Sequence, residues 1–474
     1  MKFFKSQDAM CNTEKEAAEK RALTQGLMTE GPIYRQILLF SLPLILGNLF
    51  QQLYNMVDSI VVGNFIGGNA LAAVGTGAPI INLLIGLFMG LTAGAGVVIS
   101  QYFGAEDDEK VSQTVHTAAA FTLIFGVLLS IFGFFMVDHI LRWIHTPDEI
   151  FAQASLYLRV FFSGILFMAV YNTGASILRA AGDSQTPLFY LGITCFLNII
   201  LDIGCIVVLK MGVEGVAIAT ILSQGISAVL VVRKLMHSSQ SYRLILKEIR
   251  LHPARLKQIL IVGIPTGLQQ VVISMSNVIV QGYVNSFGAA AIAGWSAYSK
   301  LDGILFLPVM SFGLTITTFA GQNIGAGKLD RVRQGVRACL IMSCTFSILS
   351  TIPIYILGDH ILSVFCKEPD VLQYGVYMLR GMIPFYFLLA FVQVFSGIIS
   401  GSGHSFATML LMVSNMCGLR IVILWVLAPH ATNATFIFLS YILSWLSCAI
   451  CLGIYYYSGR WKHGAIDRFQ EKTN

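Results

Sequence analysis

The chain has 474 residues, of which 56% are apolar and only 11% are charged, and its formal net charge is +6. Soluble globular domains carry about a quarter charged residues, so this composition excludes a water-soluble protein and indicates an integral membrane protein. The small positive charge requires no nucleic-acid partner. The nine cysteines lie mostly inside apolar runs, a position that favours packing over a disulfide framework or a metal site.

The N-terminal segment is polar as far as about Glu30. It lacks an apolar run followed by small residues at which a leader could be cleaved. We therefore expect no removable signal peptide, and the first apolar segment would direct its own insertion.

Apolar segments long enough to cross a bilayer follow one another along the rest of the chain. Crossing the hydrocarbon core takes about 20 mostly apolar residues in a helix. Twelve segments meet this length, at about 36–63, 72–101, 115–136, 153–181, 187–209, 213–236, 257–286, 291–320, 334–357, 373–400, 405–428 and 433–457. The predicted fold class is an all-α integral membrane protein with twelve transmembrane helices.

The sequence repeats itself after 221 residues. The four residues that start at Asp138 recur with the same letters at Asp359. Further matches at this offset are Gln101 with Gln322, Arg159 with Arg380 and Gly182 with Gly403. Such a repeat indicates duplication of a six-helix lobe, and an even number of spans gives the two lobes parallel orientation about a pseudo-two-fold axis along the membrane normal.

The distribution of Lys and Arg predicts which side of the membrane each connection occupies. The connections opposite the termini hold only Arg142, Lys210 and Lys367, so both termini are expected in the cytoplasm. The expected parts are an N-terminal tail (1–33), an N-lobe (34–236), a cytoplasmic linker (237–256), a C-lobe (257–457) and a C-terminal tail (458–474). We expect the linker to form a short basic amphipathic helix at the inner leaflet.

Two acids inside the spans are the main functional signal, because ionisable groups in a bilayer are costly. Asp58 lies on a polar face of the first span, and Asp202 shares a helix face with Asn198 on the fifth. Neither acid recurs in the second repeat, where Val280 and Ile423 stand. A pair of buried carboxyl groups can hold a proton, and oxygen ligands also suit Na⁺, so the pair indicates ion coupling by H⁺ or Na⁺.

Neutral polar residues extend this pattern. Tyr157, Asn172 and Thr220 lie in other spans of the same half, where they could either belong to the site or make interhelical hydrogen bonds. The polar face of the first span recurs in the seventh, which predicts a substrate cavity lined by both halves. Its expected lining residues are Gln52, Asn55, Gln270, Asn277, Gln281 and Lys300. The sequence leaves the roles of Lys300, Asp302 and Arg420 open.

Several short motifs, spread over nearly the whole chain beyond its first ~30 residues, resemble one known family. They are Val57-Asp58-Ser59, Ser100-Gln101-Tyr102-Phe103-Gly104-Ala105, Leu178-Arg179-Ala180-Ala181-Gly182-Asp183-Ser184, Leu197-Asn198-Ile199-Ile200-Leu201-Asp202 and Gly321-Gln322-Asn323-Ile324-Gly325-Ala326-Gly327. The chain resembles the MATE (multidrug and toxic compound extrusion) transporters, in particular their DinF-like bacterial branch. The resemblance implies two six-helix lobes in the bacterial inner membrane. It also implies antiport of H⁺ or Na⁺ against amphipathic, often cationic, drugs and dyes, with no other cofactor.

The resemblance also implies where the coupling ion binds. In DinF-like members the N-lobe pocket uses residues that match Asp58, Tyr157, Asn172, Asn198, Asp202 and Thr220. The other main bacterial branch carries acids in spans seven and ten, near the positions of Ile273 and Ala390 in this sequence. Because both residues are apolar here, we expect no cation site in the C-lobe.

Two other function classes fit the sequence less well than an exporter. A flippase for a lipid-linked or peptide-like precursor would need several cations for the pyrophosphate, and only Lys300 and Arg420 are candidates. A membrane enzyme is not expected, because the sequence shows no HExxH motif, nucleophile–base pairing or phosphate loop. The expected partners are a small-molecule substrate and the lipid bilayer, with no nucleic acid, and the protein is expected to act as a monomer.

Overall fold

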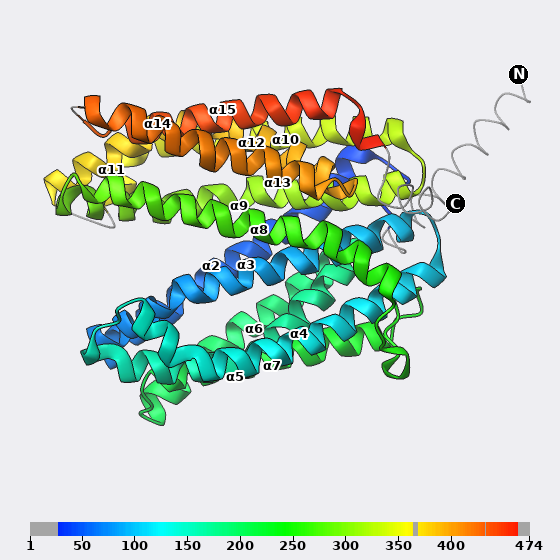
Figure 1. Ribbon diagram of the computed structural model, residues 1–474, viewed down its shortest axis with the longest axis horizontal. Helices are drawn as coiled ribbons and strands as arrows, with labels where there is room; N and C mark the ends of the chain where they lie inside the picture. Colours follow the sequence, from blue (N-terminus) through cyan, green and yellow to red (C-terminus); the bar gives the residue numbers. More distant parts are fainter. Residues whose placement is uncertain (1–26, 364–367, 432, 463–474) are drawn as a thin grey trace, which may run out of the picture. The chain divides into compact units, whose positions relative to one another are not determined.

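The computed structural model describes residues 27–363, 368–431 and 433–462, without the side chains of residues 78–80, 82 and 83. Within these ranges every regular element is a helix (Figure 1). Twelve segments are long and apolar enough to span a membrane. The fold is therefore all-α with twelve candidate transmembrane spans, which confirms the prediction.

Most helices exceed the ~20 residues that a bilayer core requires, because polar ends extend beyond their apolar parts. The first-half helices are α2 (Ile33–Val61) with the π-helix η1 (Val62–Ile66), α3 (Gly68–Gly104), α4 (Asp108–Trp143), α5 (Asp148–Ala180), α6 (Gln185–Ile203) with the π-helix η2 (Gly204–Val208), and α7 (Val213–Met236). The second-half helices are α8 (Pro253–Asn285), α9 (Ala289–Gly325), α10 (Leu329–Ser363), α11 (Pro369–Met382) with η4 (Ile383–Phe385), α12 (Tyr386–Gly401), α13 (Ser405–Val413) with the π-helix η5 (Ser414–Leu419), α14 (Arg420–Leu427) with η6 (Ala428–His430), and α15 (Thr435–Tyr457).

The chain forms two compact units. The N-terminal unit comprises Leu46–Gly263, and the C-terminal unit comprises the chain up to Ile45 together with the chain from Ile264 onward. Each unit therefore contains the beginning of the other half's first helix. The two divisions fall inside continuous helices, close to Pro43 in α2 and Pro265 in α8. The lobe, linker and tail limits inferred from the sequence stay predictions.

The N-terminal unit is built around α5, which packs against α3, α4 and α7. Small residues let these helices approach closely. A Cβ atom added at Gly164 of α5 would lie 2.2 Å from Ile221 of α7, and one at Gly96 of α3 would lie 2.7 Å from Ser176 of α5. The Ser176 hydroxyl uses this approach to donate a 2.8 Å hydrogen bond to the carbonyl oxygen of Thr92.

The C-terminal unit is built around α9, which packs against α10, α11 and α12 (Figure 1). A Cβ atom at Gly397 of α12 would lie 2.5 Å from the carbonyl oxygen of Gly313 and 3.1 Å from the hydroxyl of Thr317. Gly397 occupies the repeat position of Ser176, and Thr317 that of Gly96. Both halves therefore have a close helix contact at this place. In the first half the glycine is the earlier residue of the pair, and in the second half it is the later one.

A matching ion pair supports each half. Arg159 of α5 pairs with Asp138 of α4, and Ser155 also donates a 2.5 Å hydrogen bond to Asp138. Arg380 of α11 pairs with Asp359 of α10 at 2.7 Å. All four charged side chains are between about one third and one half exposed, so we attribute interhelical alignment to these pairs rather than much stability.

From residue 237 to residue 252 the linker is irregular apart from one short 3₁₀ turn, so the predicted amphipathic helix is wrong. The 3₁₀ turn is Leu246–Glu248, and α8 begins at Pro253, inside the predicted linker. The backbone N–H of Ile245 donates to Nε2 of His116 at 3.0 Å, and the N–H of His252 donates to the Thr117 hydroxyl at 3.2 Å. These α4 side chains bind the backbone donors that a helix would have used, and Pro253 disfavours helical geometry at the residue before it.

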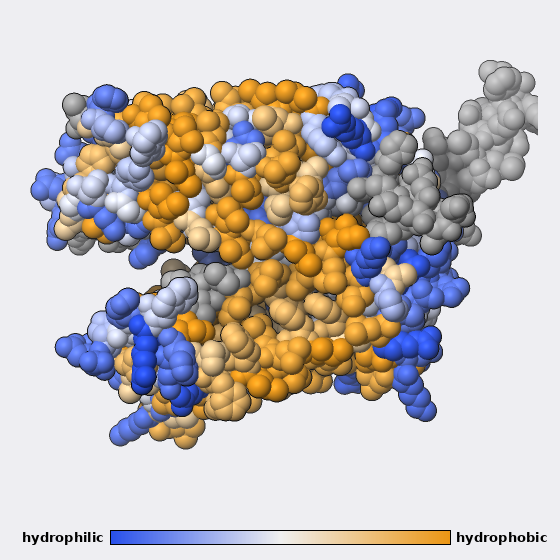
Figure 2. Space-filling view, viewed as in Figure 1, coloured by the Kyte–Doolittle hydropathy of each residue, from blue (hydrophilic) through white to orange (hydrophobic). Residues whose placement is uncertain are grey.

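The outer surface of each unit is apolar along the helices. Hydrophobic side chains cover much of the face shown in Figure 2, and hydrophilic residues gather toward its two ends. Large apolar side chains such as Phe135, Ile356 and Trp425 are more than half exposed. This distribution fits lipid contact along the helices and water contact at their ends.

Candidate functional site

Asp58 and Asp202, predicted from separate spans, lie next to each other in the N-terminal unit. Asp58 of α2 is partly buried, Asp202 of α6 is fully buried, and their carboxyl groups lie close enough for their charges to interact. Within the described part of the chain, one oxygen of Asp58 and both oxygens of Asp202 are buried without a hydrogen-bond donor. Two ionised carboxylates cannot donate to each other, so a proton or a cation would satisfy these oxygens.

Three hydroxyl groups from three helices adjoin the pair. The Tyr54 hydroxyl donates a 3.1 Å hydrogen bond to the hydroxyl of Thr220 on α7, and Tyr54 also interacts with Asp58. Tyr157 of α5 lies close enough to interact with both acids. The structure thus brings the predicted Tyr157 and Thr220 to the acids. It adds Tyr54, one helical turn before Asp58, a position from which the sequence could have identified it.

The two predicted asparagines differ in their surroundings. Asn198 is fully buried one turn before Asp202, and neither its amide nitrogen nor its amide oxygen has a partner among the described residues. The amide of Asn172 instead donates a 2.8 Å hydrogen bond to the carbonyl oxygen of Met168 in its own helix. Asn198 therefore adds unsatisfied polar atoms close to the acids, whereas the nitrogen of Asn172 is already engaged.

Both acids lie just before π-helical turns. The π-helix η1 begins at Val62, one turn after Asp58, and η2 begins at Gly204, two residues after Asp202. A π-turn leaves the regular hydrogen-bond ladder of an α-helix, and such turns occur frequently at functional sites. The backbone that follows each acid thus departs from a regular α-helix inside a candidate membrane span.

The C-terminal unit lacks these acids at the repeat positions. Val280 is fully buried where Asp58 would recur, and Ile423 is partly buried where Asp202 would recur. Arg420, three residues before Ile423, is only 1% exposed, and its Nη1 donates a 3.1 Å hydrogen bond to Oδ1 of Asn277. Its guanidinium also lies 4.0 Å from the centroid of the Tyr441 ring. The second half therefore buries a cation three residues before one of these positions.

Aromatic side chains surround this part of the C-terminal unit. The hydroxyl of Tyr298 donates a 3.0 Å hydrogen bond to Asp302 and lies 3.1 Å from the hydroxyl of Tyr386. We define the aromatic cluster as Trp295, Tyr298, Tyr386, Tyr441 and Trp445, whose rings contact one another. Asp302 is therefore hydrogen-bonded within the cluster, and sequence reasoning did not identify these aromatic partners.

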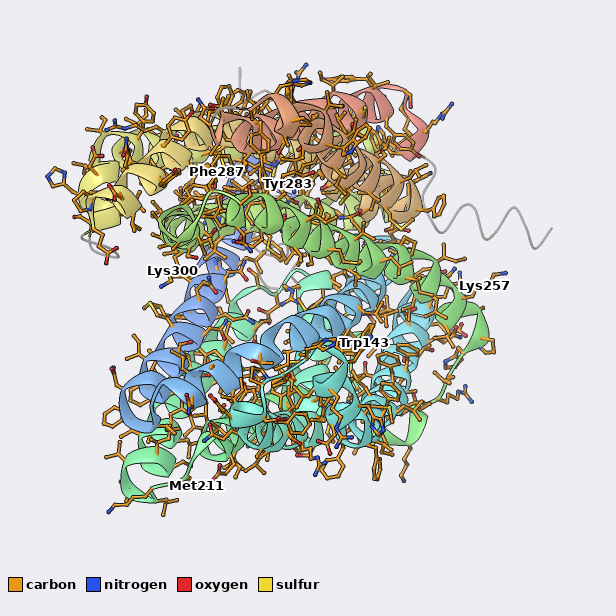
Figure 3. All side chains as sticks on the ribbon, turned by 60° about the vertical axis from the view of Figure 1, so that its left-hand side comes forward. Trp143, Met211, Lys257, Tyr283, Phe287 and Lys300 are labelled. Atoms are coloured by element: carbon orange, nitrogen blue, oxygen red, sulfur yellow. The ribbon has the colours of Figure 1, made fainter. Side chains whose placement is uncertain are left out.

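The residues predicted to line a substrate cavity are mostly exposed on α2 and α8. Gln52, Asn55, Gln270 and Asn277 are exposed, and Gln281 is partly buried. The amide of Gln281 donates a 2.9 Å hydrogen bond to Asn285. The side chain of Lys300 extends exposed from α9 (Figure 3). Each unit thus offers a polar helix surface in an otherwise apolar span.

The site can supply carboxylate, hydroxyl and amide oxygens. No cluster of three or more His, Cys, Asp or Glu side chains is found among the described residues. Two carboxyl groups with neutral oxygens suit a proton or a monovalent hard cation better than a tightly held transition metal.

Comparison with known proteins identifies the class. The family model MatE matches residues 43–203 and again residues 265–426, once in each half. The probable multidrug resistance protein YpnP of Bacillus subtilis (strain 168) is 31% identical over 454 residues, which cover 94% of this chain and 99% of the relative. The probable multidrug resistance protein NorM of Thermotoga maritima is 25% identical, over 84% of this chain and 86% of the relative.

Solved structures show the same fold. A crystal structure of a MATE protein in complex with MaL6 matches with a TM-score of 0.86 at 22% identity, over 91% of this chain and 97% of that chain. The family model and the relatives together identify a multi-pass membrane transporter rather than an enzyme. The chain belongs to the MatE family.

Proposed function

We propose that this transporter is a cation-coupled antiporter that exports amphipathic, cationic small molecules such as drugs and dyes. The coupling ion, H⁺ or Na⁺, binds at Asp58 and Asp202 and is the one cofactor. The observation that carries this proposal is the close approach of two carboxyl groups whose buried oxygens have no donor. The names of several relatives, which call them multidrug resistance proteins, support the substrate class.

The chemistry of coupling follows from repulsion between the acids. With no ion bound, two carboxylates this close repel, and desolvation adds to the cost of both charges. A proton between them creates the missing hydrogen bond, and Na⁺ would instead be ligated by the same oxygens together with Thr220 and Asn198. One charge moved through 100 mV supplies about 2.3 kcal/mol, which is enough to bias a conformational equilibrium.

The proposed substrate surface is the polar face of each unit. It consists of Gln52, Asn55, Gln270, Asn277, Gln281 and Lys300, most of which are exposed. Alternating access would use α2, which continues through Pro43 without the backbone hydrogen bond that proline cannot donate. The protein would act as a monomer in the bacterial inner membrane, with both termini in the cytoplasm.

The test is dye efflux from proteoliposomes under one ion gradient at a time. We expect an imposed proton gradient or an imposed sodium gradient to drive a cationic dye outward, and the dye gradient to drive the same ion inward. Empty liposomes and liposomes with a collapsed gradient are the controls. Equal dye flux with and without every gradient would overturn coupling.

A second experiment tests the substrate surface. Asn55→Cys and Asn277→Cys, each in a background without native cysteines, should react with a small polar thiol reagent, and a bound dye should slow both reactions. Leu128→Cys, at an exposed apolar position of α4, is the control that a dye should not protect. Reaction rates that ignore the dye at both asparagine positions would remove these residues from the substrate surface.

A further inference from the structure

Arg420 is an arginine in an unusual place. It lies near the middle of the span Ser405–His430 and is 1% exposed. Burial of an arginine at membrane depth is costly unless its charge is compensated, so such residues are functional hypotheses. We therefore expect the Arg420 guanidinium to have a partner that offsets the free-energy cost of burying its charge.

The partners within the protein fall short of that requirement. A guanidinium presents a fork of N–H donors and accepts nothing. Among the described residues Arg420 makes one hydrogen bond, to Asn277, and its Nε is buried without an acceptor. Its guanidinium lies against the Tyr441 ring, and among the described residues it makes no ion pair with a carboxylate.

The two arginines of the interhelical ion pairs differ from Arg420 in having a carboxylate partner. Arg159 and Arg380, which are also in spans, each hold a carboxylate of the neighbouring helix. Asp302, the acid of the aromatic cluster, accepts a hydrogen bond from Tyr298 and makes no ion pair with Arg420. Arg420 therefore retains a positive charge without an internal counter-ion.

Asn277 places a neutral oxygen where an anion would bind. Its side chain is exposed, while its Oδ1 accepts from the buried guanidinium at 3.1 Å. The adjacent backbone is fixed, because Ser276 donates to the carbonyl oxygen of Met416 at 3.4 Å and Cys417 donates to that of Val272 at 3.5 Å. Rotation of one exposed amide would open the guanidinium fork without moving α8 away from η5.

We propose that Arg420, Asn277 and Tyr441 form a binding site for the carboxylate of an aromatic substrate. A carboxylate matches the planar guanidinium fork with two parallel hydrogen bonds, which a single amide oxygen cannot do. The Tyr441 ring lies on the guanidinium and contacts Trp295 and Trp445, so an aromatic ring attached to the carboxylate has aromatic surface beside it. The protein thus accepts anionic as well as cationic amphiphiles.

This inference rests on the proposed function only in taking the ligand to be an export substrate. Binding can therefore be tested without transport. Full-length protein in phosphatidylcholine nanodiscs is titrated with fluorescein, which carries a carboxylate, and with a cationic rhodamine ester that has the same xanthene ring system. Fluorescence polarisation reports both affinities, while the coupled efflux assay reports the proposed function separately.

The variants separate the charge from the fold. Arg420→Gln should weaken fluorescein binding by about tenfold or more and leave the rhodamine ester within about twofold, because only the anion loses a charged partner. Arg380→Gln removes the same charge elsewhere in the unit and should change neither affinity. Asn277→Asp supplies an internal carboxylate to Arg420 and should also weaken fluorescein binding, so it decides the matter if Arg420→Gln does not fold.

Two results would overturn the proposal. One is fluorescein binding that is equal in the unaltered protein, Arg420→Gln and Asn277→Asp, or absent in all three. The other is displacement of fluorescein by phosphatidylglycerol added to the nanodiscs, which would make a lipid headgroup the occupant. Loss of coupled dye efflux with intact fluorescein binding would contradict the proposed function and leave this site standing.

Discussion

The two halves of the chain share their supports and differ in their buried charges. Asp138 with Arg159 and Asp359 with Arg380 form the same ion pair at matching positions. Asp58 has no such counterpart, because Val280 stands at its repeat position. The repeated ion pairs thus connect neighbouring helices in both halves, whereas the unrepeated Asp58 and Asp202 have buried oxygens without a donor among the described residues.

A second repeated motif has a structural role in both halves. Gln322 and Asn323 bind the backbone of Met28, which precedes α2. At the repeat position of Asn323, Tyr102 hydrogen-bonds with Gln258 near the start of α8. Each half therefore receives the beginning of the other half's first helix at the same place, which explains why this motif repeats.

The largest effect is expected at the unrepeated acids. Asp58→Asn and Asp202→Asn should each reduce ion-coupled efflux to the level of empty liposomes. The single carboxyl group that remains has no second carboxylate with which to share a proton, and it cannot complete the oxygen ligands of Na⁺. Efflux is measured at equal amounts of inserted protein. Asp359→Asn, an acid that serves only an ion pair, should keep most of its efflux. Full ion coupling in either Asp58→Asn or Asp202→Asn would show that coupling does not depend on the unrepeated acids.

The sequence predicts those features whose signals are local or periodic. The twelve spans follow from the length of the apolar runs, and the halves follow from residues matched at one offset. The meeting of Asp58 and Asp202 follows because neither acid can face lipid, so both must turn toward the same unit interior.

The partners of Arg420 could not be predicted in this way. Asn277 and Arg420 are 143 positions apart, and their contact depends on how α8 packs against η5. Tyr441 gives no signal either, since tyrosines are common in apolar spans. In the linker the sequence pattern predicts a helix that does not form. His116 and Thr117 accept hydrogen bonds from its backbone instead.

An effect of intermediate size, on thermal stability, is expected at the close contact between Gly397 and Thr317. Gly397→Ser would place in the second half the residue that Ser176 supplies in the first, but Thr317 already fills the space that Gly96 leaves open. Overpacking of this kind costs about 1–3 kcal/mol. The double variant Gly397→Ser with Thr317→Gly should recover part of that loss. Thermal unfolding in detergent measures both, with Gly282→Ala, where nothing lies within 4 Å, as control. A single variant as stable as the unaltered protein would mean that the two contacts are not equivalent.

The linker predicts a smaller effect, confined to the first half. Burial, and then the charges of Arg250, His116 and Arg255, lower the pKa of His252, whose Nε2 accepts from Arg250 at 3.1 Å. The folded state therefore takes up a proton less readily than the unfolded chain. Its stability should fall as the pH drops below about 6.5, the ordinary histidine value.

His252→Gln should flatten this pH dependence by at most about 2 °C in the thermal midpoint, because the side chain is partly exposed. His237→Gln, an exposed linker histidine, is the control. In the second half the segment before α2 is held by Gln322, Asn323 and Lys328, none of which is a histidine, so no such dependence is expected there. An unchanged pH profile in His252→Gln would place the titrating group elsewhere.

The smallest effect is expected at the repeat positions of the acids. Val280→Ala and Ile423→Ala remove no group that could bind a proton or a cation, so the number of ions exchanged per dye should stay unchanged. Because Val280 is fully buried in the core of its unit and Ile423 only partly, Val280→Ala should lower the thermal midpoint more. The ratio of ion to dye flux in proteoliposomes checks the first expectation, and unfolding in detergent checks the second. A changed flux ratio in the folded Val280→Ala variant would show that the second half takes part in coupling despite its lack of acids at these positions.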